Sequence, residues 1–363
     1  MTRMKLLLVG GFLASGKTTA IYSAAKLLKA SGRKAGILTN DQGKQQVDTG
    51  FIRGKGFPNE EVAGSCFCCN FNAMSGGIQR LHEDIQPDII FAESVGSCAD
   101  LAATIINPLL TLQPDRYNIV LSVFADIRLL VAFLKNEQPV FHENVSYIYQ
   151  KQLDEADIIV ANKIDLLSVP ELDHAKAVIS DAFPDKIILY QNSLSEKGIQ
   201  HWLDACENFH NATLRPALNI DYDKYGAGEA ELAWLDEEVG IVSEDKNAVK
   251  AALLLADTVY NKIKAGNYPI GHLKFLLDNG RSQTKISFSP FGDTNSMEQH
   301  TMEESAKAVL LVNARVQTAP QVLQDIITEA IVETENTTAS KITEYTTTAF
   351  QPGYPRPTYR IIA

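Results

Sequence analysis

The first group of residues that could do chemistry forms a phosphate loop. Residues 11–18 read Gly-Phe-Leu-Ala-Ser-Gly-Lys-Thr, which fits the pattern G-x-x-x-x-G-K-[ST]. In this pattern the glycines let backbone N–H groups point at phosphate oxygens, the lysine reaches the β- and γ-phosphates, and the threonine hydroxyl binds Mg²⁺. Lys17 is therefore predicted to be catalytic and Thr18 to be a Mg²⁺ ligand. The predicted nucleotide-binding residues here are Gly11, Ala14, Ser15, Gly16, Lys17, Thr18 and Thr19.

A base-reading motif follows later in the chain. Residues 162–165 read Asn-Lys-Ile-Asp, which fits N-K-x-D. Guanine presents its N1–H and its N2 amino group side by side, and the Asp165 carboxylate can accept from both. Adenine lacks this pair of donors and would leave Asp165 unpaired, so the motif predicts GTP or GDP rather than ATP. Asn162 is predicted to contact the purine edge and to tie this loop to the phosphate loop, Lys163 to lie over the base, and a backbone N–H near Ser193 to complete the pocket.

Three cysteines in four positions form the next candidate site. Cys66, Cys68 and Cys69 lie just before a predicted helix at residues 71–85, and only two other cysteines occur in the chain. A helix N-terminus favours the thiolate form that binds metal, and thiolates select soft or borderline ions over Mg²⁺. These cysteines are predicted to hold Zn²⁺, although Co²⁺ and Ni²⁺ share the same ligands. The alternative is that they are simply small buried side chains.

Residues 93–96, Glu-Ser-Val-Gly, form a candidate phosphate-sensing segment after an apolar run. Glu93 is predicted to be a Mg²⁺ ligand or to position water, and the backbone of Gly96 to contact the nucleotide near the γ-phosphate. Asp41 is a third predicted catalytic residue, since it could reach the Mg²⁺ or its water shell, but it could also only close a turn. Cys98 could approach the thiol cluster, although packing at the start of a helix is the favoured interpretation.

These residues need a sheet to position them. Apolar runs of strand length alternate with helical segments up to residue 212, which predicts an α/β domain with a mainly parallel sheet, a P-loop NTPase domain. Residues 41–63 lack periodicity and contain several glycines, so we expect a long loop there that serves as a switch segment. The expected strands of this domain are residues 4–9, 34–40, 87–93, 117–124, 157–161 and 186–190.

The second half has a different pattern. Residues 213–228 are predicted to be a linker, and residues 229–363 a smaller α+β domain. Its predicted element order is β-α-β-β-α-β, with a hairpin turn at residues 278–280 and further strands at residues 342–350 and 358–362. His272 is expected to be structural rather than a metal ligand.

Composition excludes several classes. The net charge of −11 argues against binding to nucleic acid or to an anionic membrane, both of which need a basic face. No apolar run is as long as a membrane span, and residues 6–9 are too short for a signal peptide core, so no targeting segment is expected. The five cysteines do not form a secreted disulfide framework, which favours the cytoplasm.

The motifs GGFLASGKTT, GSCFCCN, ESVG and NKID, in this order, resemble those of the CobW-like GTPases, relatives of the hydrogenase and urease maturation proteins HypB and UreG. The resemblance covers about residues 4–212, and the segment GHLKFLL at residues 271–277 is similar to the CobW C-terminal domain. It implies a GTP-hydrolysing metallochaperone that binds its metal at the cysteines and delivers it to a client metalloprotein. The chain departs from the family pattern at Ala14, where a glycine is frequent, and at residues 40–44, which read N-D-Q-G-K in place of N-E-F-G-E.

Two other functions are open at this point. The protein could be a GTP-dependent activator of a metalloenzyme or corrinoid protein in which the cysteines hold a structural zinc. It could also be a P-loop kinase or another ATP-dependent enzyme, which the N-K-x-D motif argues against. The identity of the metal and of the client, the formation of a homodimer, and completion of the metal site by Cys98 or by the C-terminal domain are also open.

Overall fold

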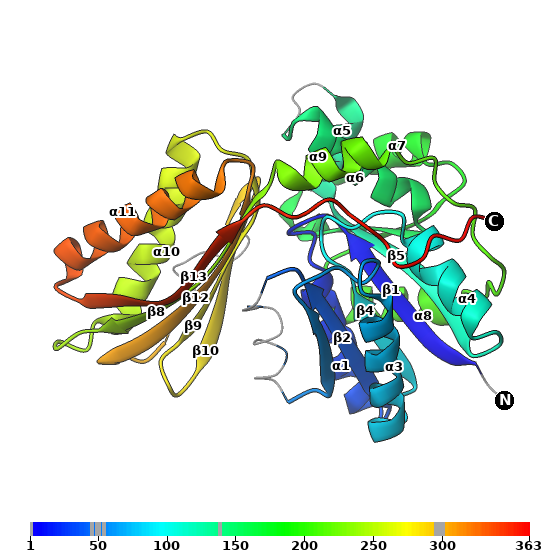
Figure 1. Cartoon of the computed structure of the whole chain (residues 1–363), viewed down its shortest axis with the longest axis horizontal. Helices are drawn as coiled ribbons and strands as arrows, with labels where there is room; N and C mark the ends of the chain where they lie inside the picture. The colour runs from blue at the N-terminus through cyan, green and yellow to red at the C-terminus, as the bar shows by residue number, and fades with distance from the viewer. Residues whose placement is uncertain (1–2, 44–46, 48–51, 53–55, 137–139, 294–301) are drawn as a thin grey trace. The chain divides into compact units, whose positions relative to one another are not determined.

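The computed structural model describes residues 3–43, 47, 52, 56–136, 140–293 and 302–363. The chain divides into two compact units (Figure 1). The first contains residues 1–42, 56–228 and 355–363, and the second contains residues 43–55 and 229–354. The chain passes from the first unit to the second within helix α9.

The first unit is built on a parallel sheet. In the described residues this sheet has seven strands in the order β3-β2-β4-β1-β5-β6-β7. The inner strands β1 and β4 are almost entirely buried, as expected for strands that are covered on both faces, and this is why they are continuous apolar runs. The strands are β1 Met4–Gly11, β2 Ala35–Asp41, β3 Asn59–Ala63, β4 Ile89–Glu93, β5 Tyr117–Asp126, β6 Ile158–Asn162 and β7 Ile187–Gln191.

Helices pack on both faces of this sheet (Figure 1). Helix α8 is fixed by Trp202, which is fully buried, lies 5.0 Å from the Phe124 ring and donates from Nε1 to the Ser122 hydroxyl at 3.1 Å. Helical segments also connect most of the other strands of this sheet, as the alternation of strands and helices in the sequence predicts. The helical segments are α1 Lys17–Ala30, α3 Phe71–Ile85, η1 Ala102–Ile106, α4 Asn107–Leu112, α5 Ile127–Lys135, α6 Glu143–Glu155, η2 Ile164–Leu166, α7 Val169–Ala182, α8 Glu196–Asn208 and α9 Tyr222–Ala230.

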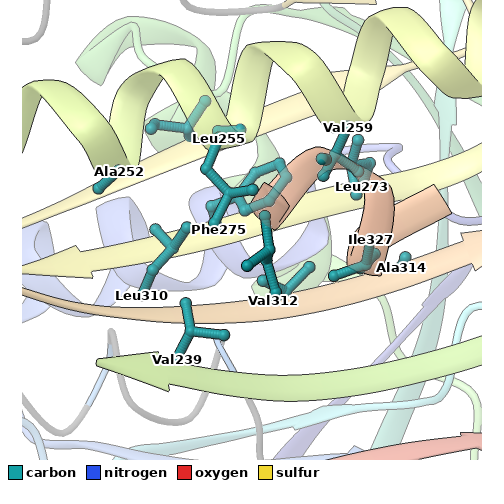
Figure 2. Close-up of a cluster of buried hydrophobic side chains, with 14 of the residues drawn as sticks. Val239, Ala252, Leu255, Val259, Leu273, Phe275, Leu310, Val312, Ala314 and Ile327 are labelled. Carbon is teal, nitrogen blue, oxygen red and sulfur yellow. The ribbon is translucent and has the colours of Figure 1, made fainter. Parts of the chain in front are cut away.

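The second unit is an antiparallel sheet with helices α10 Ala248–Ala265 and α11 Pro320–Thr338. In the described part of the chain its six strands have the order β11-β10-β9-β12-β8-β13. Figure 2 shows its core, where Phe275, Leu310 and Val312 from the strands meet Leu255 from α10 and Ile327 from α11. The strands are β8 Ala233–Val242, β9 Ile270–Asp278, β10 Gln283–Ser289, β11 Gly292–Asp293, β12 Lys307–Val316 and β13 Lys341–Phe350.

Buried charges also lie within this second unit. Arg315 is fully buried, donates to Asp236 Oδ1 at 2.8 Å and stacks on the Trp234 ring at 3.9 Å. Asn313 donates to the same carboxylate at 2.9 Å and accepts from the backbone N–H of Val47 at 2.7 Å. Val47 comes from the stretch between β2 and β3, which is why residues 43–55 belong to the second unit.

The structure confirms the predicted fold class, an α/β P-loop domain followed by a smaller α+β domain. The helix at residues 71–85 and the hairpin between β9 and β10 are also confirmed. The predicted switch loop at residues 41–63 is wrong in part, because residues 59–63 form strand β3. This edge strand has one buried side chain, Val62, and so has no apolar run. Residues 44–46, 48–51 and 53–55 of that loop, Lys44 among them, lie outside the described residues.

Two further predictions need correction. The predicted linker contains helix α9, and its Gly228 is a packing residue, since a Cβ there would lie 2.4 Å from the Asn144 carbonyl oxygen. Residues 358–362 form no strand, and they belong to the first unit. The predicted domains, 1–212 and 229–363, therefore differ from the observed units in two places. These are the C-terminal segment and residues 43–55. No helix in the described part of the chain combines the length and the apolar composition that a bilayer span requires.

Candidate functional site

The phosphate loop connects the end of β1 to the start of α1. Gly11 and Gly16 have φ angles of 122° and 95°, which favour glycine. A Cβ at Gly11 would lie 2.1 Å from the Phe124 carbonyl oxygen, and one at Gly16 would lie 2.4 Å from Asn162 Nδ2. Ala14 also has a left-handed φ, 56°, which explains why a glycine suits this position. The loop is therefore a tight cradle in which the backbone itself can surround a phosphate.

Lys17 and Thr18 follow at the first turn of α1. The Lys17 ammonium donates to the carbonyl oxygens of Gly11 and Phe12 at 2.7 and 3.1 Å. The Thr18 hydroxyl donates to Glu93 Oε1 at 2.8 Å, and both side chains are buried. Because β4 lies beside β1 in the sheet, the carboxylate at the end of β4 meets the hydroxyl that a Mg²⁺ ion requires. These oxygens fit a Mg²⁺ site.

Asp41 and Gly96 lie at the same edge of the sheet. Asp41 ends β2, the neighbour of β4, and its side chain is partly exposed. Gly96 follows β4, and a Cβ there would lie 3.1 Å from the backbone nitrogen of Leu13 in the phosphate loop. The turn after β4 therefore rests directly on the phosphate loop, where its backbone can respond to a bound phosphate.

The base-reading loop is tied to the phosphate loop, as the sequence predicts. Asn162 Nδ2 donates to the carbonyl oxygen of Ser15 at 2.8 Å. Asn162 Oδ1 accepts from the backbone N–H of Ser193 at 3.1 Å and from its hydroxyl at 2.8 Å. Asp165 lies in η2 with an exposed side chain. The three loops that follow β1, β6 and β7 thus converge on one candidate nucleotide site, to which Thr19 is adjacent on α1.

Sequence reasoning missed Asp126, which lies at the end of β5. The Lys163 ammonium lies 3.0 Å from Asp126 Oδ2, and Arg128 donates to the same carboxylate at 2.7 and 3.0 Å. Burial opposes ionisation of Asp126, but the hydrogen bonds from Arg128 and the charge of Lys163 outweigh it and lower its pKa. Asp126 therefore positions Lys163, whose φ of 67° turns the chain into η2.

The cysteines form a cluster at the start of α3. The sulfur atoms of Cys66, Cys68 and Cys69 all lie within 4.8 Å of one another. Cys66 and Cys68 are 4% and 2% exposed, and Cys69 is more accessible. The loop is closed by the backbone N–H groups of Cys69 and Asn70, which donate to the Cys66 carbonyl oxygen at 3.1 and 3.0 Å. In a tetrahedral zinc site with Zn–S bonds of about 2.3 Å the sulfurs lie about 3.8 Å apart, so this donor set fits Zn²⁺ with small side-chain movements.

The three thiols shift one another's pKa values in opposite directions. Hydrogen bonds from Cys68 first, then from Cys69 and Cys98, hold the pKa of the Cys66 thiol well below its usual value. The pKa of Cys68 is raised well above its usual value and that of Cys69 to about 11, in both cases first because of the hydrogen bond with Cys66. A metal ion that binds here must displace the remaining protons, which makes its affinity fall as the pH falls.

Asn40 holds the cysteine loop in place. Its Nδ2 donates to the carbonyl oxygens of Val62 and Ser65 at 2.8 and 2.7 Å, and its Oδ1 accepts from the backbone N–H of Phe67 at 2.8 Å. This residue precedes Asp41 on β2, so one short stretch of strand positions the cysteine loop and supplies a candidate catalytic carboxylate. The sequence segment N-D-Q-G-K includes Asn40 but does not reveal this role, because its partners lie more than 20 positions away.

The C-terminal segment of the chain covers the same loop. The Thr358 backbone N–H donates to the Cys68 carbonyl oxygen at 2.8 Å, and its hydroxyl donates to the Cys69 carbonyl oxygen at 3.0 Å. Arg360 anchors this segment, since its Nε donates to the buried Asp100 carboxylate at 2.7 Å and its Nη2 to the Leu218 carbonyl oxygen at 3.0 Å. We call residues 355–363, which end the red trace in Figure 1, the C-terminal strap.

Removing the anchor of the strap is expected to expose Cys69. Arg360→Ala deletes a charge-assisted hydrogen bond to a buried carboxylate, and a loss of local stability of this kind raises the population of opened strap about 10-fold or more. The rate at which iodoacetamide labels Cys69 in the metal-free protein should rise by that factor. Arg356→Ala is the matched control, because it keeps the backbone N–H that bonds Cys69 and removes only an exposed side chain. Equal labelling rates in Arg360→Ala and the wild type would show that the strap does not limit access.

The fold and this pair of sites define a P-loop nucleotide-binding protein that carries a thiol cluster beside its nucleotide site. Residues 5–189, about half of the chain, match the family model described as "CobW/HypB/UreG, nucleotide-binding domain". The chain therefore belongs to the CobW/HypB/UreG family.

Two curated relatives have partial matches. The zinc chaperone YeiR of Escherichia coli (strain K12) is 32% identical over 182 residues, which cover 48% of this chain and 50% of YeiR. The zinc chaperone CobW of Sinorhizobium sp is 26% identical over 274 residues, which cover 65% of this chain and 77% of that protein. The chain thus spans about half the length of the first relative.

Solved structures of HypB are also similar. HypB from Helicobacter pylori in complex with nickel is 16% identical, with a TM-score of 0.43 over 58% of this chain and 91% of that one. The hydrogenase maturation factor HypB from Archaeoglobus fulgidus is 17% identical, with a TM-score of 0.38 over 56% of this chain and 89% of that one.

Proposed function

We propose that this protein is a GTP-hydrolysing metallochaperone of the cytoplasm that binds Zn²⁺ at Cys66, Cys68 and Cys69 and delivers it to a client metalloprotein. Two relatives that are called zinc chaperones support this proposal. The thiol donor set supports a zinc cargo over a hard ion such as Mg²⁺. Cys69, the least buried of the three cysteines, gives a client a point at which to take over the ion.

One observation carries the proposal, namely the adjacency of Asn40 and Asp41 at the end of β2. Asn40 holds the cysteine loop by three hydrogen bonds, and Asp41 follows it at the edge where Thr18 and Glu93 meet. A shift of this strand end on nucleotide exchange therefore changes the thiol site as well. Coupling of two ligands through a shared element is reciprocal, so zinc must alter the nucleotide affinity by the same factor.

The residues around the phosphate loop support the proposed hydrolytic role. Mg²⁺, when bound, supplies positive charge to the β- and γ-phosphates. Lys17 neutralises the same phosphates, and Glu93, whose Oε1 accepts from Thr18, is placed to orient a water molecule. Asp165 selects guanine through its two acceptor oxygens. We assign Lys17, Glu93 and Asp41 to the hydrolytic site.

The experiment that tests the proposal is a comparison of Zn²⁺ affinity in two nucleotide states. The full chain is loaded with GDP or with a non-hydrolysable GTP analogue, and Zn²⁺ is titrated against a chromophoric chelator. We expect the two dissociation constants to differ by about 10-fold, within the range of ordinary coupling energies. Equal constants would overturn nucleotide-gated delivery.

The same titration on Cys66→Ser separates a cargo site from a structural zinc site. A cargo site predicts lost Zn²⁺ binding with an unchanged melting temperature of the metal-free chain and unchanged GTP hydrolysis. If the zinc is structural, the melting temperature of the zinc-loaded wild type should lie well above that of the Cys66→Ser variant. The variant should also lose GTP hydrolysis. Cys206→Ser is the control, because Cys206 is a buried thiol that lies in α8, away from the cluster.

A further inference from the structure

Cys98 lies in the turn that follows β4, two residues beyond Gly96. It is 0% exposed, as a packed residue would be, but it is not part of a helix. Its thiol lies within hydrogen-bonding reach of two members of the cluster, the thiols of Cys66 and Cys68. Four of the five cysteines of the chain therefore meet at one place.

The backbone of Cys98 is held firmly at this place. Gln152, which is 1% exposed, donates from the same Nε2 to the carbonyl oxygens of Gly96 and Cys98, at 3.0 and 2.8 Å. The backbone N–H of the next residue, Ala99, donates to the Tyr225 hydroxyl at 3.1 Å. Because this backbone is held in place, the Cys98 side chain can move only by rotation about its own bonds. The sulfur atom therefore stays close to the cluster.

We propose that Cys98 is the fourth protein ligand of the metal site, which makes it a four-thiolate zinc site. This inference rests on the proposed zinc binding at the other three cysteines. The three sulfurs within 4.8 Å of one another do not include that of Cys98, so closure of the tetrahedron requires a rotation of the Cys98 or Cys69 side chain. Four thiolates complete the coordination that Zn²⁺ adopts in closed protein sites.

A four-thiolate site needs compensation, because four thiolates and Zn²⁺ carry a net charge of −2. The positive end of helix α3, which begins at Phe71 directly after the cluster, supplies part of it. The backbone N–H of Arg356 in the C-terminal strap donates to the Cys69 thiol and supplies another part.

The position of Cys98 also links the proposed metal site to the nucleotide site. The segment that carries it begins at Glu93, which contacts Thr18, and passes through Gly96, which rests on the phosphate loop. Of the four proposed ligands, Cys98 is therefore the one that lies in a segment contacting the phosphate loop. The other three belong to the single loop before α3. Withdrawal of this one ligand converts a closed site into a three-thiolate site with an open position for a client ligand.

The test counts the thiolates around Co²⁺, which is added alone to the full chain as a spectroscopic substitute for Zn²⁺. The thiolate-to-Co²⁺ charge-transfer band of Cys98→Ser should be about one quarter weaker than that of the wild type, because three of four thiolates remain. Its Zn²⁺ dissociation constant should rise at least about 10-fold, since loss of even an indirect partner of a ligand costs that much. Cys206→Ser, another fully buried thiol, should keep both wild-type values.

The outcomes separate the two proposals. A wild-type band and affinity in Cys98→Ser would overturn the fourth ligand and leave the three-cysteine site standing. A wild type without any thiolate band would overturn zinc binding itself. X-ray absorption of the zinc-loaded wild type supplies a readout without any variant, since a shell of four sulfurs supports the inference and a shell of three sulfurs with one oxygen or nitrogen contradicts it.

Discussion

Asp165→Asn is expected to lower the affinity for GTP about 1,000-fold, because the carboxylate is the only group of the motif that can accept from both N1–H and the N2 amino group of guanine. An asparagine offers one acceptor and one amino donor, so its amino group faces the guanine amino group without an acceptor. Xanthine carries a carbonyl at the corresponding carbon, which accepts from that amino group. The variant should therefore bind xanthosine triphosphate more tightly than GTP.

Competition of GTP and xanthosine triphosphate for a fluorescent nucleotide measures both affinities. Asp173→Asn is the matched control, since this carboxylate is 70% exposed on α7 and pairs only loosely with Lys176 at 3.7 Å. It should keep the wild-type preference for GTP. If Asp165→Asn bound GTP as tightly as the wild type, the base would have to lie elsewhere, and the assignment of guanine would fail.

Glu93→Gln is expected to slow GTP hydrolysis about 100-fold, the usual cost of removing a positioned charged group from a site of this kind. The glutamine can still accept a hydrogen bond from the Thr18 hydroxyl at the distance of 2.8 Å that Glu93 Oε1 shows. The fold and the affinity for GDP should therefore change little, and the loss should appear in the rate constant of the chemical step. Single-turnover hydrolysis with protein in excess over GTP isolates this step.

Glu196→Gln at the exposed start of α8 is the control for charge alone and should hydrolyse GTP at the wild-type rate. A Glu93→Gln variant that hydrolyses GTP as fast as the wild type would remove Glu93 from the catalytic group and leave the carboxylate of Asp41 as the candidate. The same measurement on Asp41→Asn then decides between the two positions.

The candidate site was predictable from the sequence wherever its residues are neighbours in the chain. The phosphate loop and the base-reading loop are each a few consecutive residues at the end of an apolar strand, so composition and spacing are enough. The cysteine cluster is equally local. The parallel sheet followed from the alternation of apolar runs with helices, because such runs have few other ways to be buried on both faces.

The parts that sequence reasoning missed depend on distant contacts. Asn40 and Thr358 reach the cysteine loop across separations of 22 to 289 positions, and no local pattern shows these contacts. The sequence favours packing for Cys98 and leaves its approach to the cluster open, because a single buried cysteine is usually a packing residue and only the position of the turn after β4 brings it near the cluster. Strand β3 was missed because an edge strand needs only one buried side chain, and Val62 alone makes no pattern.

The C-terminal strap is synthesised long after the cysteine loop that it covers. Thr358 is translated 289 residues after Cys69, and at about 5–20 residues per second this interval lasts roughly 15–60 seconds. During that interval a growing chain already has its cysteines but not the segment that bonds their carbonyl oxygens. Every new molecule therefore passes through a stage in which the strap does not yet cover the thiol cluster, and we expect its thiols to react fastest with oxidants at that stage.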